Sequence, residues 1–170
     1  KVARLNMLKN ISNYHTPAEW ENHLAAFLAW PKNKETWFEY LPIVQQKYLE
    51  IIEILTKYEK VFLLVDDDKT IKEVQKLLKN KGIDLEQIKF IILPTIDAWI
   101  RDYGPISIKN DQDELAFLNW KFNGWGEKYD DLMKDKTINK KGRKYCTGVD
   151  CKYQRPMTKF DFINNGSNNV

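Results

Sequence analysis

The sequence has few of the residues that mark several large classes of protein. It contains 2 cysteines, 2 histidines, 7 glycines and 6 prolines among 170 residues. So few glycines and prolines exclude collagen-like chains, elastic linkers and low-complexity segments. Two cysteines are too few for a disulfide framework, and His15 and His23 lack the spacing of metal ligands. We therefore expect a globular protein without a disulfide framework and without a His/Cys metal site.

Long apolar runs and a strong charge of one sign are also missing. The run Leu24–Trp30 is the longest at seven residues, which is too short to span a bilayer. The formal net charge is only +3 and both signs are interspersed, so we expect no nucleic-acid partner and no membrane. No signal peptide opens the chain. A cytoplasmic location is therefore expected. Because the chain starts at Lys1 rather than methionine, secretion after removal of a leader is the alternative.

The residues that are present can build a folded core. Hydrophobic residues make up 43% of the chain and aromatic residues 13%, which is far from a disordered composition. Short apolar segments alternate with helical periodicity, a pattern typical of an α/β layer structure. Strands are predicted at Leu24–Trp30, Val61–Val65 and Ile88–Leu93, helices at about 41–58 and 70–81, and a hairpin from Gly104–Ile108 and Leu115–Phe122 around the polar turn Asn110–Asp113.

The second helix has clear signals at both ends. Asp68 is expected to cap its start, and Gly82 is a good residue for ending it. Its predicted apolar face consists of Ile71, Val74, Leu77 and Leu78. The first helix has apolar residues at helical spacing from Ile43 to Leu55.

The composition changes beyond Asp130. The range 134–144 is rich in lysine, and Asn164–Asn169 is a polar tract without a closing element. Cys146 and Cys151 lie close together and are either two ordinary thiols or a local disulfide. We therefore expect residues 1–170 to be the N-terminal portion of a single larger domain.

One segment concentrates candidate functional residues. Directly after a predicted buried strand, seven residues contain Asp97, Trp99, Arg101, Asp102 and Tyr103. Loops in this position often carry function in α/β proteins. A carboxylate beside an indole suits a planar cation such as guanidinium, because the acid accepts two hydrogen bonds and the ring supplies a flat wall. The structural alternative is that Arg101 pairs with Asp97 or Asp102 and the tryptophan belongs to the core.

Two other segments are unusual. In Asn119–Tyr129, Gly124 and Gly126 flank Trp125, so that the backbone can turn sharply and present the indole. Its mixture of aromatic residues and lysines is also found in single-strand nucleic-acid platforms, but neighbouring acidic residues cancel the charge. The third segment, Thr16–Pro31, is interpreted as a polar turn leading into the first strand. His23 within it is expected to be a surface or capping residue rather than a base.

Together these segments resemble the agmatine deiminase and Porphyromonas-type peptidyl-arginine deiminase family. The family patterns Pro-Ala-Glu-Trp-Glu-x-His and Ala-Trp-Pro match Pro17–His23 and Ala29–Pro31. Asp-x-Trp-x-Arg-Asp-x-Gly-Pro matches Asp97–Pro105, and Phe-Asn-x-Trp-Gly-x-Lys-Tyr matches Phe122–Tyr129. The three segments occur in the family's order, and the resemblance covers about residues 14–131.

The resemblance implies a pentein, or α/β propeller, in which ββαβ-type units surround a central active site. It also implies hydrolysis of a guanidinium group. A cysteine attacks the guanidinium carbon, ammonia leaves, a histidine moves the protons, and water resolves the intermediate. A guanidinium carbon is a poor electrophile, so the cation must be held by carboxylates while a low-pKa thiolate attacks. No metal or organic cofactor is implied.

Carried over by position, Asp102 is the expected catalytic residue that grips the guanidinium. The expected substrate-binding residues are Trp99, Asp102, Asp97 and Trp125, with Asp97 and Arg101 in supporting positions. The family's cysteine follows a Gly-Gly-Gly-x-x-His motif that has no match here. The family's Glu-Gly-Gly-Ser/Asn pattern has its nearest match at 164–167, with asparagine in place of glutamate.

The expected substrate is agmatine, giving N-carbamoylputrescine and ammonia in polyamine metabolism. The segment Phe122–Tyr129 has no arginine to bind a substrate carboxylate. A peptidyl-arginine or free-arginine deiminase, or a non-catalytic guanidinium-binding fragment, is the alternative. The expected partner is the small guanidinium substrate, and a homo-oligomer is also expected.

Overall fold

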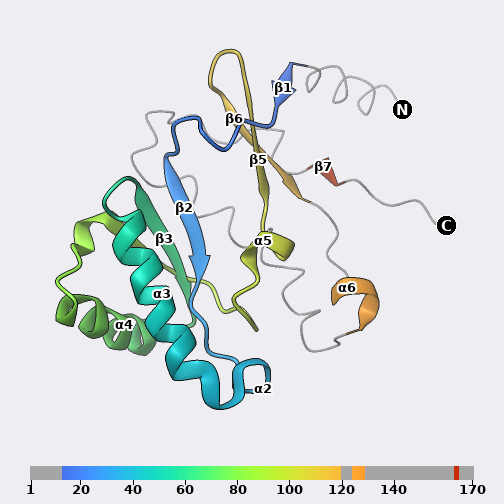
Figure 1. The fold of residues 1–170 in the computed structure, drawn as a ribbon. Coiled ribbons are helices and arrows are strands. Elements are labelled where there is room, and N and C mark those ends of the chain that lie inside the picture. The colour runs from blue at the N-terminus through green and yellow to red at the C-terminus, as the bar shows by residue number, and fades with distance from the viewer. Residues whose placement is uncertain (1–12, 120–123, 129–162, 165–170) are drawn as a thin grey trace.

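The protein contains two β-sheets with helices packed mainly on one of them (Figure 1). A computed structural model describes residues 13–119, 124–128 and 163–164. Its strands are β1 (Tyr14–His15), β2 (Ala25–Ala29), β3 (Lys60–Val65), β4 (Ile88–Ile92), β5 (Ile106–Asn110), β6 (Leu115–Asn119) and β7 (Ile163–Asn164). Its α-helices are α2 (Lys34–Trp37), α3 (Leu41–Leu55), α4 (Asp68–Asn80), α5 (Ile100–Tyr103) and the turn α6 (Gly124–Glu127), with 3-10 turns at Phe38–Tyr40 and Leu85–Gln87.

The predicted order of strand, helix, strand, helix, strand is confirmed. β2, β3 and β4 form a parallel sheet in sequential order, with Leu63 opposite Leu28 and Phe90. The strands are almost wholly apolar because both faces of the sheet are covered. The α/β interpretation is therefore correct for this part of the chain.

Alternate residues of β3 pack into two separate cores. Leu63 and Val65 face α3 and α4, where Leu49, Ile52, Val74 and Leu78 pack with them. Leu64 points to the other face, in a cluster that includes Ile91 and Tyr103. Because Tyr103 belongs to α5, the second core anchors the segment that follows β4.

The two long helices differ from the prediction in detail. The first ends at Leu55 rather than near Tyr58, and the Thr56 hydroxyl donates to the Ile52 carbonyl at 2.9 Å just beyond its end. Ile43 and Ile51, predicted by periodicity to line this helix, are exposed. In α4, Val74 and Leu78 are buried, but Leu77 is 39% exposed.

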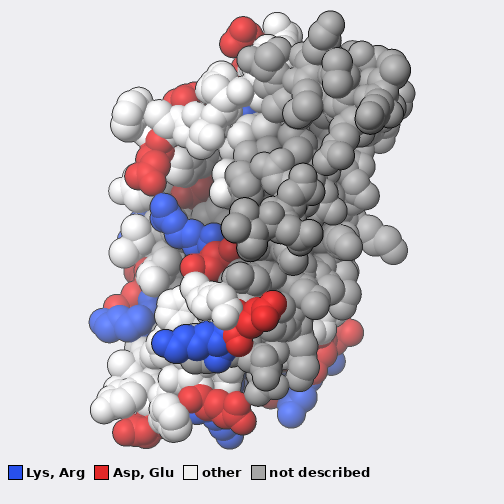
Figure 2. Space-filling view, turned by 90° about the vertical axis from the view of Figure 1, so that its right-hand side faces the viewer, with Lys and Arg blue, Asp and Glu red and all other residues white. Residues whose placement is uncertain are grey.

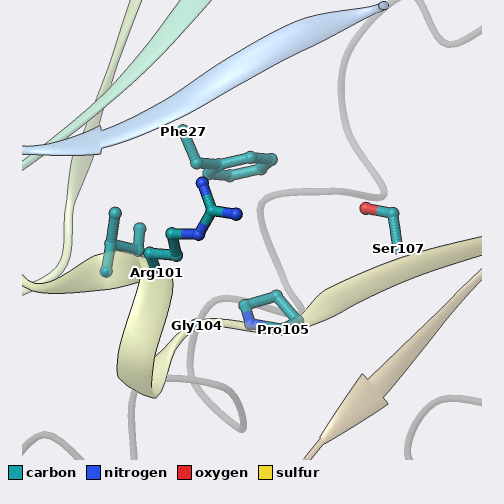
Figure 3. A pocket seen from close by; sticks show the side chains of 6 residues that line it. Phe27, Arg101, Gly104, Pro105 and Ser107 are labelled. Carbon is teal, nitrogen blue, oxygen red and sulfur yellow. The ribbon is translucent and has the colours of Figure 1, made fainter. Parts of the chain in front are cut away.

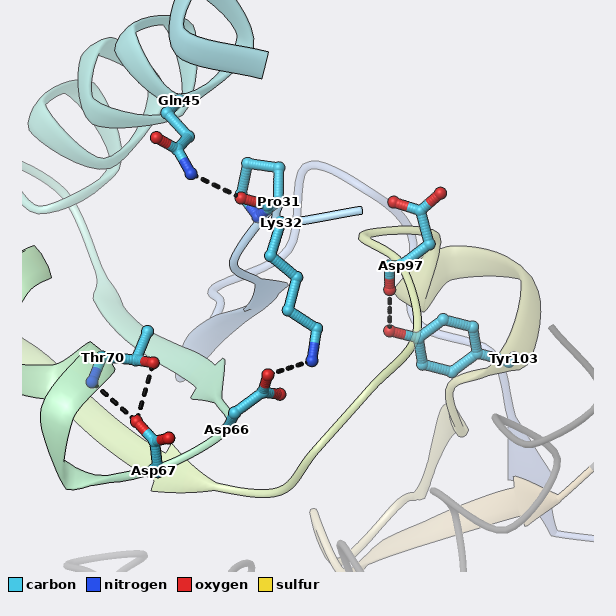
Figure 4. Close-up of polar contacts among 8 residues, drawn as sticks. All are labelled: Pro31, Lys32, Gln45, Asp66, Asp67, Thr70, Asp97 and Tyr103. Atoms are coloured by element: carbon cyan, nitrogen blue, oxygen red, sulfur yellow. Dashed lines mark hydrogen bonds and ion pairs between the residues drawn. The ribbon is translucent and has the colours of Figure 1, made fainter. Parts of the chain in front are cut away.

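The cap of α4 is Asp67, so the prediction of Asp68 is wrong by one residue. The Asp67 carboxylate accepts from the Thr70 backbone N–H at 2.7 Å and from its hydroxyl at 2.8 Å. The preceding Asp66 pairs with Lys32 instead (Figure 4). Asp68 lies in the first turn of the helix. Gly82 adopts φ +73° just after the helix, as a terminating glycine does.

The second sheet has the order β1-β5-β6-β7. β5 and β6 form the predicted hairpin, but its strands are Ile106–Asn110 and Leu115–Asn119, so Gly104 and Pro105 precede it. Asn110 closes the turn by accepting from the backbone N–H groups of Gln112 and Glu114 at 3.0 and 2.9 Å. β7 pairs with β6 in parallel, and its Asn164 begins the predicted polar tract.

Several predicted features lie outside the described residues. These are the lysine-rich range 134–144, Cys146, Cys151 and the range 165–169. On the face in Figure 2, acidic and basic side chains of the described residues lie next to one another. Within the described ranges, no helix is both long and apolar enough to cross a membrane.

Candidate guanidinium site

The segment after β4 places the predicted site residues on a loop and one short helix. Leu93 and Thr95 are buried, and the chain then turns through residues 96–98 into α5. The sequence predicted a functional loop here but not the helix. α5 carries Asp102 beside Tyr103, and Tyr103 is buried in the second core with 2% of its surface exposed. Asp102 is therefore fixed to the core through its neighbour.

Asp97 is a completely buried carboxylate held by N–H donors. Its Oδ1 accepts from the Trp37 indole at 3.1 Å and from the Ala98 amide at 2.7 Å. Its Oδ2 accepts from the Trp99 indole at 2.9 Å. Its backbone carbonyl accepts from the Tyr103 hydroxyl at 2.8 Å (Figure 4). Asp97 thus ties the loop, α5 and α2 together at one point.

Three tryptophans from different parts of the chain meet beside Asp97; we call Trp37, Trp99 and Trp125 the tryptophan cluster. Trp37 stacks on Trp99 with ring centroids 5.6 Å apart and an angle of 23° between the rings. Trp125 meets Trp99 edge to face, at 6.4 Å and 90°. Trp99 and Trp125 remain 39% and 40% exposed, so their indoles are accessible to a ligand.

Asp102 lies at the open side of the tryptophan cluster. Its Oδ1 accepts from the Trp125 indole N–H at 3.2 Å, and the residue is exposed. Within the described residues, Oδ2 of Asp102 makes no side-chain hydrogen bond or ion pair. The carboxylate is therefore exposed beside the partly exposed indole of Trp125.

Trp125 is presented by a left-handed turn. All four residues of α6 have positive φ, from +57° at Trp125 to +81° at Gly126. Such a conformation is costly for residues other than glycine, and Gly124 and Gly126 supply half of it. The predicted sharp turn around Trp125 is confirmed. Figure 1 shows α6 on the side of the molecule that also carries α5.

Arg101 does not pair with Asp97 or Asp102 within the described residues, so the structural alternative for it is wrong. Its guanidinium approaches Glu19 at 3.8 Å, and both side chains are at least 90% exposed. It extends toward Phe27 over a hollow of about 240 Å³, lined also by Ile100, Gly104, Pro105 and Ser107 (Figure 3). The lining does not include the tryptophan cluster, so the hollow is a separate feature.

His23 has the surface position that was expected. Its Nε2 donates to the Glu19 carbonyl at 3.0 Å, and its side chain is 52% exposed. Its Nδ1 lies 3.5 Å from Glu59. No described group of three or more His, Cys, Asp or Glu side chains is placed to hold a metal ion.

The charge of Asp97 also affects the pKa of a tyrosine in helix α3. Burial raises the pKa of the Tyr48 phenol above its ordinary value, and the negative charge of Asp97 raises it further. Tyr48 comes from α3 and packs edge to face on Trp30. The phenol therefore stays neutral well into alkaline conditions.

Trp37 is the site residue that the sequence did not indicate. It ends α2, a four-residue helix that the periodicity did not predict, and it lies 60 residues from Asp97. The available signal was the cap, since Asn33 accepts from the Glu35 amide at 2.9 Å. That signal predicts a helix start but not where the tryptophan points.

The geometry suits a flat organic cation. A carboxylate oxygen accepts hydrogen bonds from a guanidinium edge, while indole faces attract its delocalised charge. Asp102 provides the carboxylate oxygen, and Trp99 and Trp125 provide the indole faces. Asp97 is already engaged by three N–H groups from the protein.

Comparison with known proteins agrees with this chemistry. The family model described as Porphyromonas-type peptidyl-arginine deiminase matches residues 15–168. A Selenomonas ruminantium protein assigned as an agmatine deiminase is 33% identical over 122 residues, covering 72% of this chain and 32% of the relative. The agmatine deiminase of Pseudomonas syringae pv. tomato is 29% identical, covering 74% of this chain and 32% of the relative.

A solved structure shows the same likeness in three dimensions. An agmatine deiminase variant from C. jejuni with substrate bound superposes with a TM-score of 0.64 at 26% identity. The superposition covers 77% of this chain and 36% of that one. The chain therefore spans about a third of the length of these relatives.

Proposed function

The chain belongs to the Porphyromonas-type peptidyl-arginine deiminase family, and on this premise we propose that the complete protein hydrolyses agmatine to N-carbamoylputrescine and ammonia. The observation that supports this most is the position of Asp102. Its exposed carboxylate contacts the Trp125 indole, which in turn meets Trp99, so that a guanidinium could donate hydrogen bonds to the acid and stack on an indole. The names of the relatives support the same substrate class.

In the proposed mechanism, the residues of this chain bind and orient the cation. Asp102 holds one edge of the guanidinium through charge-assisted hydrogen bonds, and the two indoles hold its plane. An indole stacked on one face leaves the opposite face of the guanidinium carbon open to attack. The family resemblance supplies the remaining steps. A cysteine thiolate adds to this carbon, and the C–N bond breaks as a histidine protonates the leaving nitrogen, which departs as ammonia. Water then adds to the same carbon, and the C–S bond breaks to release the product and the thiolate. These 170 residues have no match to the motif of that cysteine.

We further propose that residues 1–170 are the N-terminal portion of a single pentein domain. The superposition on an agmatine deiminase over 77% of this chain supports a shared fold. The parallel sheet and the hairpin sheet would then belong to the first repeating units around a central site. The tryptophan cluster would face that centre.

Agmatine is preferred over peptidyl-arginine or free arginine as substrate. Arginine carries a carboxylate that needs a cationic partner, and the segment 122–129 offers only Lys128. A guanidinium-binding protein without turnover is the second candidate, since the motif of the nucleophile has no match here. A cytoplasmic location and a homo-oligomer remain predictions.

The substitution Asp102→Asn tests the proposed role. It keeps the shape but removes the charge, so kcat/KM for agmatine should fall by about thirty- to several-thousand-fold. The matched control is Asp111→Asn, which changes an exposed aspartate in the hairpin turn and should leave kcat/KM unchanged. Intact kcat/KM in the Asp102 variant, accompanied by a lowered melting temperature, would assign this carboxylate a structural role only.

A further inference from the structure

We propose that Trp37 is a positioning residue of the guanidinium site, which acts by fixing the plane of Trp99 through their common acceptor Asp97. This inference rests on the proposed function, because it assigns a role within the same site. Trp37 contacts Trp99 in two ways, by stacking at 5.6 Å and through the carboxylate that both indoles share.

The shared carboxylate determines where each indole N–H points. Trp37 donates to Oδ1 and Trp99 donates to Oδ2, so the two oxygens of Asp97 each hold one ring. Asp97 itself cannot rotate freely, because its Oδ1 also accepts from the Ala98 amide and no part of it is exposed. Hydrogen bonds to a carboxylate are shorter and stronger than those between neutral groups. Asp97 therefore acts on the substrate through the tryptophans rather than by direct contact.

Stacking adds the second constraint on Trp99. A hydrogen bond at Nε1 fixes one edge of an indole but allows the ring to tilt about that edge. With 23° between the rings, Trp37 covers one face of Trp99 and opposes this tilt. The remaining exposed surface of Trp99, 39% of the residue, is then available to a ligand in a defined orientation. Rigid walls of this kind reduce the entropy lost on binding.

The backbone beside Trp37 is strained. Phe38 follows it with φ +44° and ψ −131°, although the side chain is aromatic and 68% exposed. Such conformations cost about 1–3 kcal/mol and persist where the surroundings fix them, often at functional sites. The Phe38 side chain is mostly exposed, so burial of its own apolar surface offsets little of this cost. The turn is closed by the Phe38 amide, which donates to the Lys34 carbonyl, and the Trp37 side chain next to it contacts Asp97 and Trp99.

The experiment compares Trp37→Phe with Trp30→Phe in the complete protein. Phenylalanine at 37 keeps an aromatic ring but removes the N–H donor to Asp97. Trp30 is a buried tryptophan in the core between the parallel sheet and helices α3 and α4. Its substitution therefore reports how much stability any buried tryptophan-to-phenylalanine change costs. Melting temperature, kcat and KM for agmatine are measured on each sample.

We expect Trp37→Phe to raise KM for agmatine about ten-fold, with kcat changed by less than about three-fold. The wall contacts substrate and transition state alike, so its misplacement weakens both to a similar extent. Trp30→Phe should lower the melting temperature and leave KM unchanged. An unchanged KM in folded Trp37→Phe would overturn the proposal, as would an equal rise in KM for both variants.

Asp97→Asn gives an independent test that does not depend on how Trp37→Phe folds. An amide has one acceptor oxygen, so it can no longer hold both indoles, and KM should rise in the same way. If the wild-type protein has no turnover, the proposed deiminase function fails. Calorimetric binding of agmatine to wild type, Trp37→Phe and Asp97→Asn then decides the positioning role separately: weaker binding by the variants supports it, and equal or undetectable binding contradicts it.

Discussion

Asp97 and Asp102 lie five residues apart and have different environments. Asp97 is wholly buried and accepts three N–H groups, while Asp102 is exposed and accepts one indole N–H from Trp125. A buried carboxylate must be satisfied by donors, or its desolvation is not compensated. Asp97 meets this requirement with donors from the protein. Asp102 is exposed, so its carboxylate can bind a cation. The two residues therefore suit a positioning and a binding role respectively.

The end of α5 depends on Gly104. A Cβ placed there would lie 2.3 Å from the Ile100 carbonyl oxygen, which is a backbone atom and cannot move aside alone. We predict that Gly104→Ala destabilises the protein by about 1–3 kcal/mol, because α5 must shift to relieve the overlap. Since α5 carries Asp102, kcat/KM for agmatine should also fall. Chemical denaturation and steady-state kinetics on the same sample give both values.

Gly82→Ala is the control for this prediction. Gly82 has positive φ, so alanine costs about 1 kcal/mol there, but nothing lies within 4 Å of the added Cβ. It lies at the end of α4, away from the tryptophan cluster, and kcat/KM should stay at the wild-type value. Equal kinetic losses in the two variants would show that α5 does not position the site.

At the scale of residues, the sequence predicted which side chains gather, but not all of their contacts. Asp97, Trp99, Asp102 and Trp125 were predicted as a group, and the structure brings all four together. The burial of Asp97 could not be predicted, because it depends on an indole 60 residues away in the chain. The role of Trp37 was missed for the same reason. The pairing expected for Arg101 was wrong because α5 turns its side chain toward Glu19 and Phe27.

At the scale of helices and strands, local sequence patterns predicted some elements and missed others. The three parallel strands were predicted from short apolar runs, and each boundary agrees within about one residue. α2 and α5 were not predicted, because four residues are too few to display a helical period. Residues 66–68 are all aspartate, so composition could not determine which one caps α4. The choice depends on tertiary contact, since Lys32 engages Asp66.

The cap of α4 gives a prediction with a definite pH dependence. Hydrogen bonds from the Thr70 amide and hydroxyl lower the pKa of the Asp67 carboxyl below its ordinary value. A lowered pKa in the folded state stabilises the protein above the unfolded pKa of about 3.9, and this contribution is lost as pH falls through the folded pKa. Asp67→Ala should therefore lower the melting temperature at pH 7, with the difference from wild type shrinking toward pH 3.

Two variants control this measurement of melting temperature against pH. Asp67→Asn keeps a side-chain acceptor for the Thr70 amide and should stay close to wild type at pH 7. Asp68→Ala removes the carboxylate next along the chain, which lies in the first turn and does not cap it. A larger loss for Asp68→Ala than for Asp67→Ala would contradict the assignment of the cap.

At the scale of the whole molecule, the described residues provide the proposed binding surface and the elements that support it. The parallel sheet fixes the loop after β4, the core on one face fixes α5, and the left-handed turn of α6 places Trp125 against Asp102. The chain spans about a third of the length of these relatives.

The most direct test is the product formed by the complete protein from three guanidinium compounds. Agmatine, free arginine and a peptide containing arginine are incubated separately, and ammonia and the ureido product are quantified by mass spectrometry. We predict that agmatine gives N-carbamoylputrescine and an equal amount of ammonia. Its kcat/KM should be well above the values for free arginine and for the peptide. Faster turnover of peptidyl-arginine or free arginine would contradict the substrate assignment, and no ammonia from any of the three would contradict the deiminase function itself.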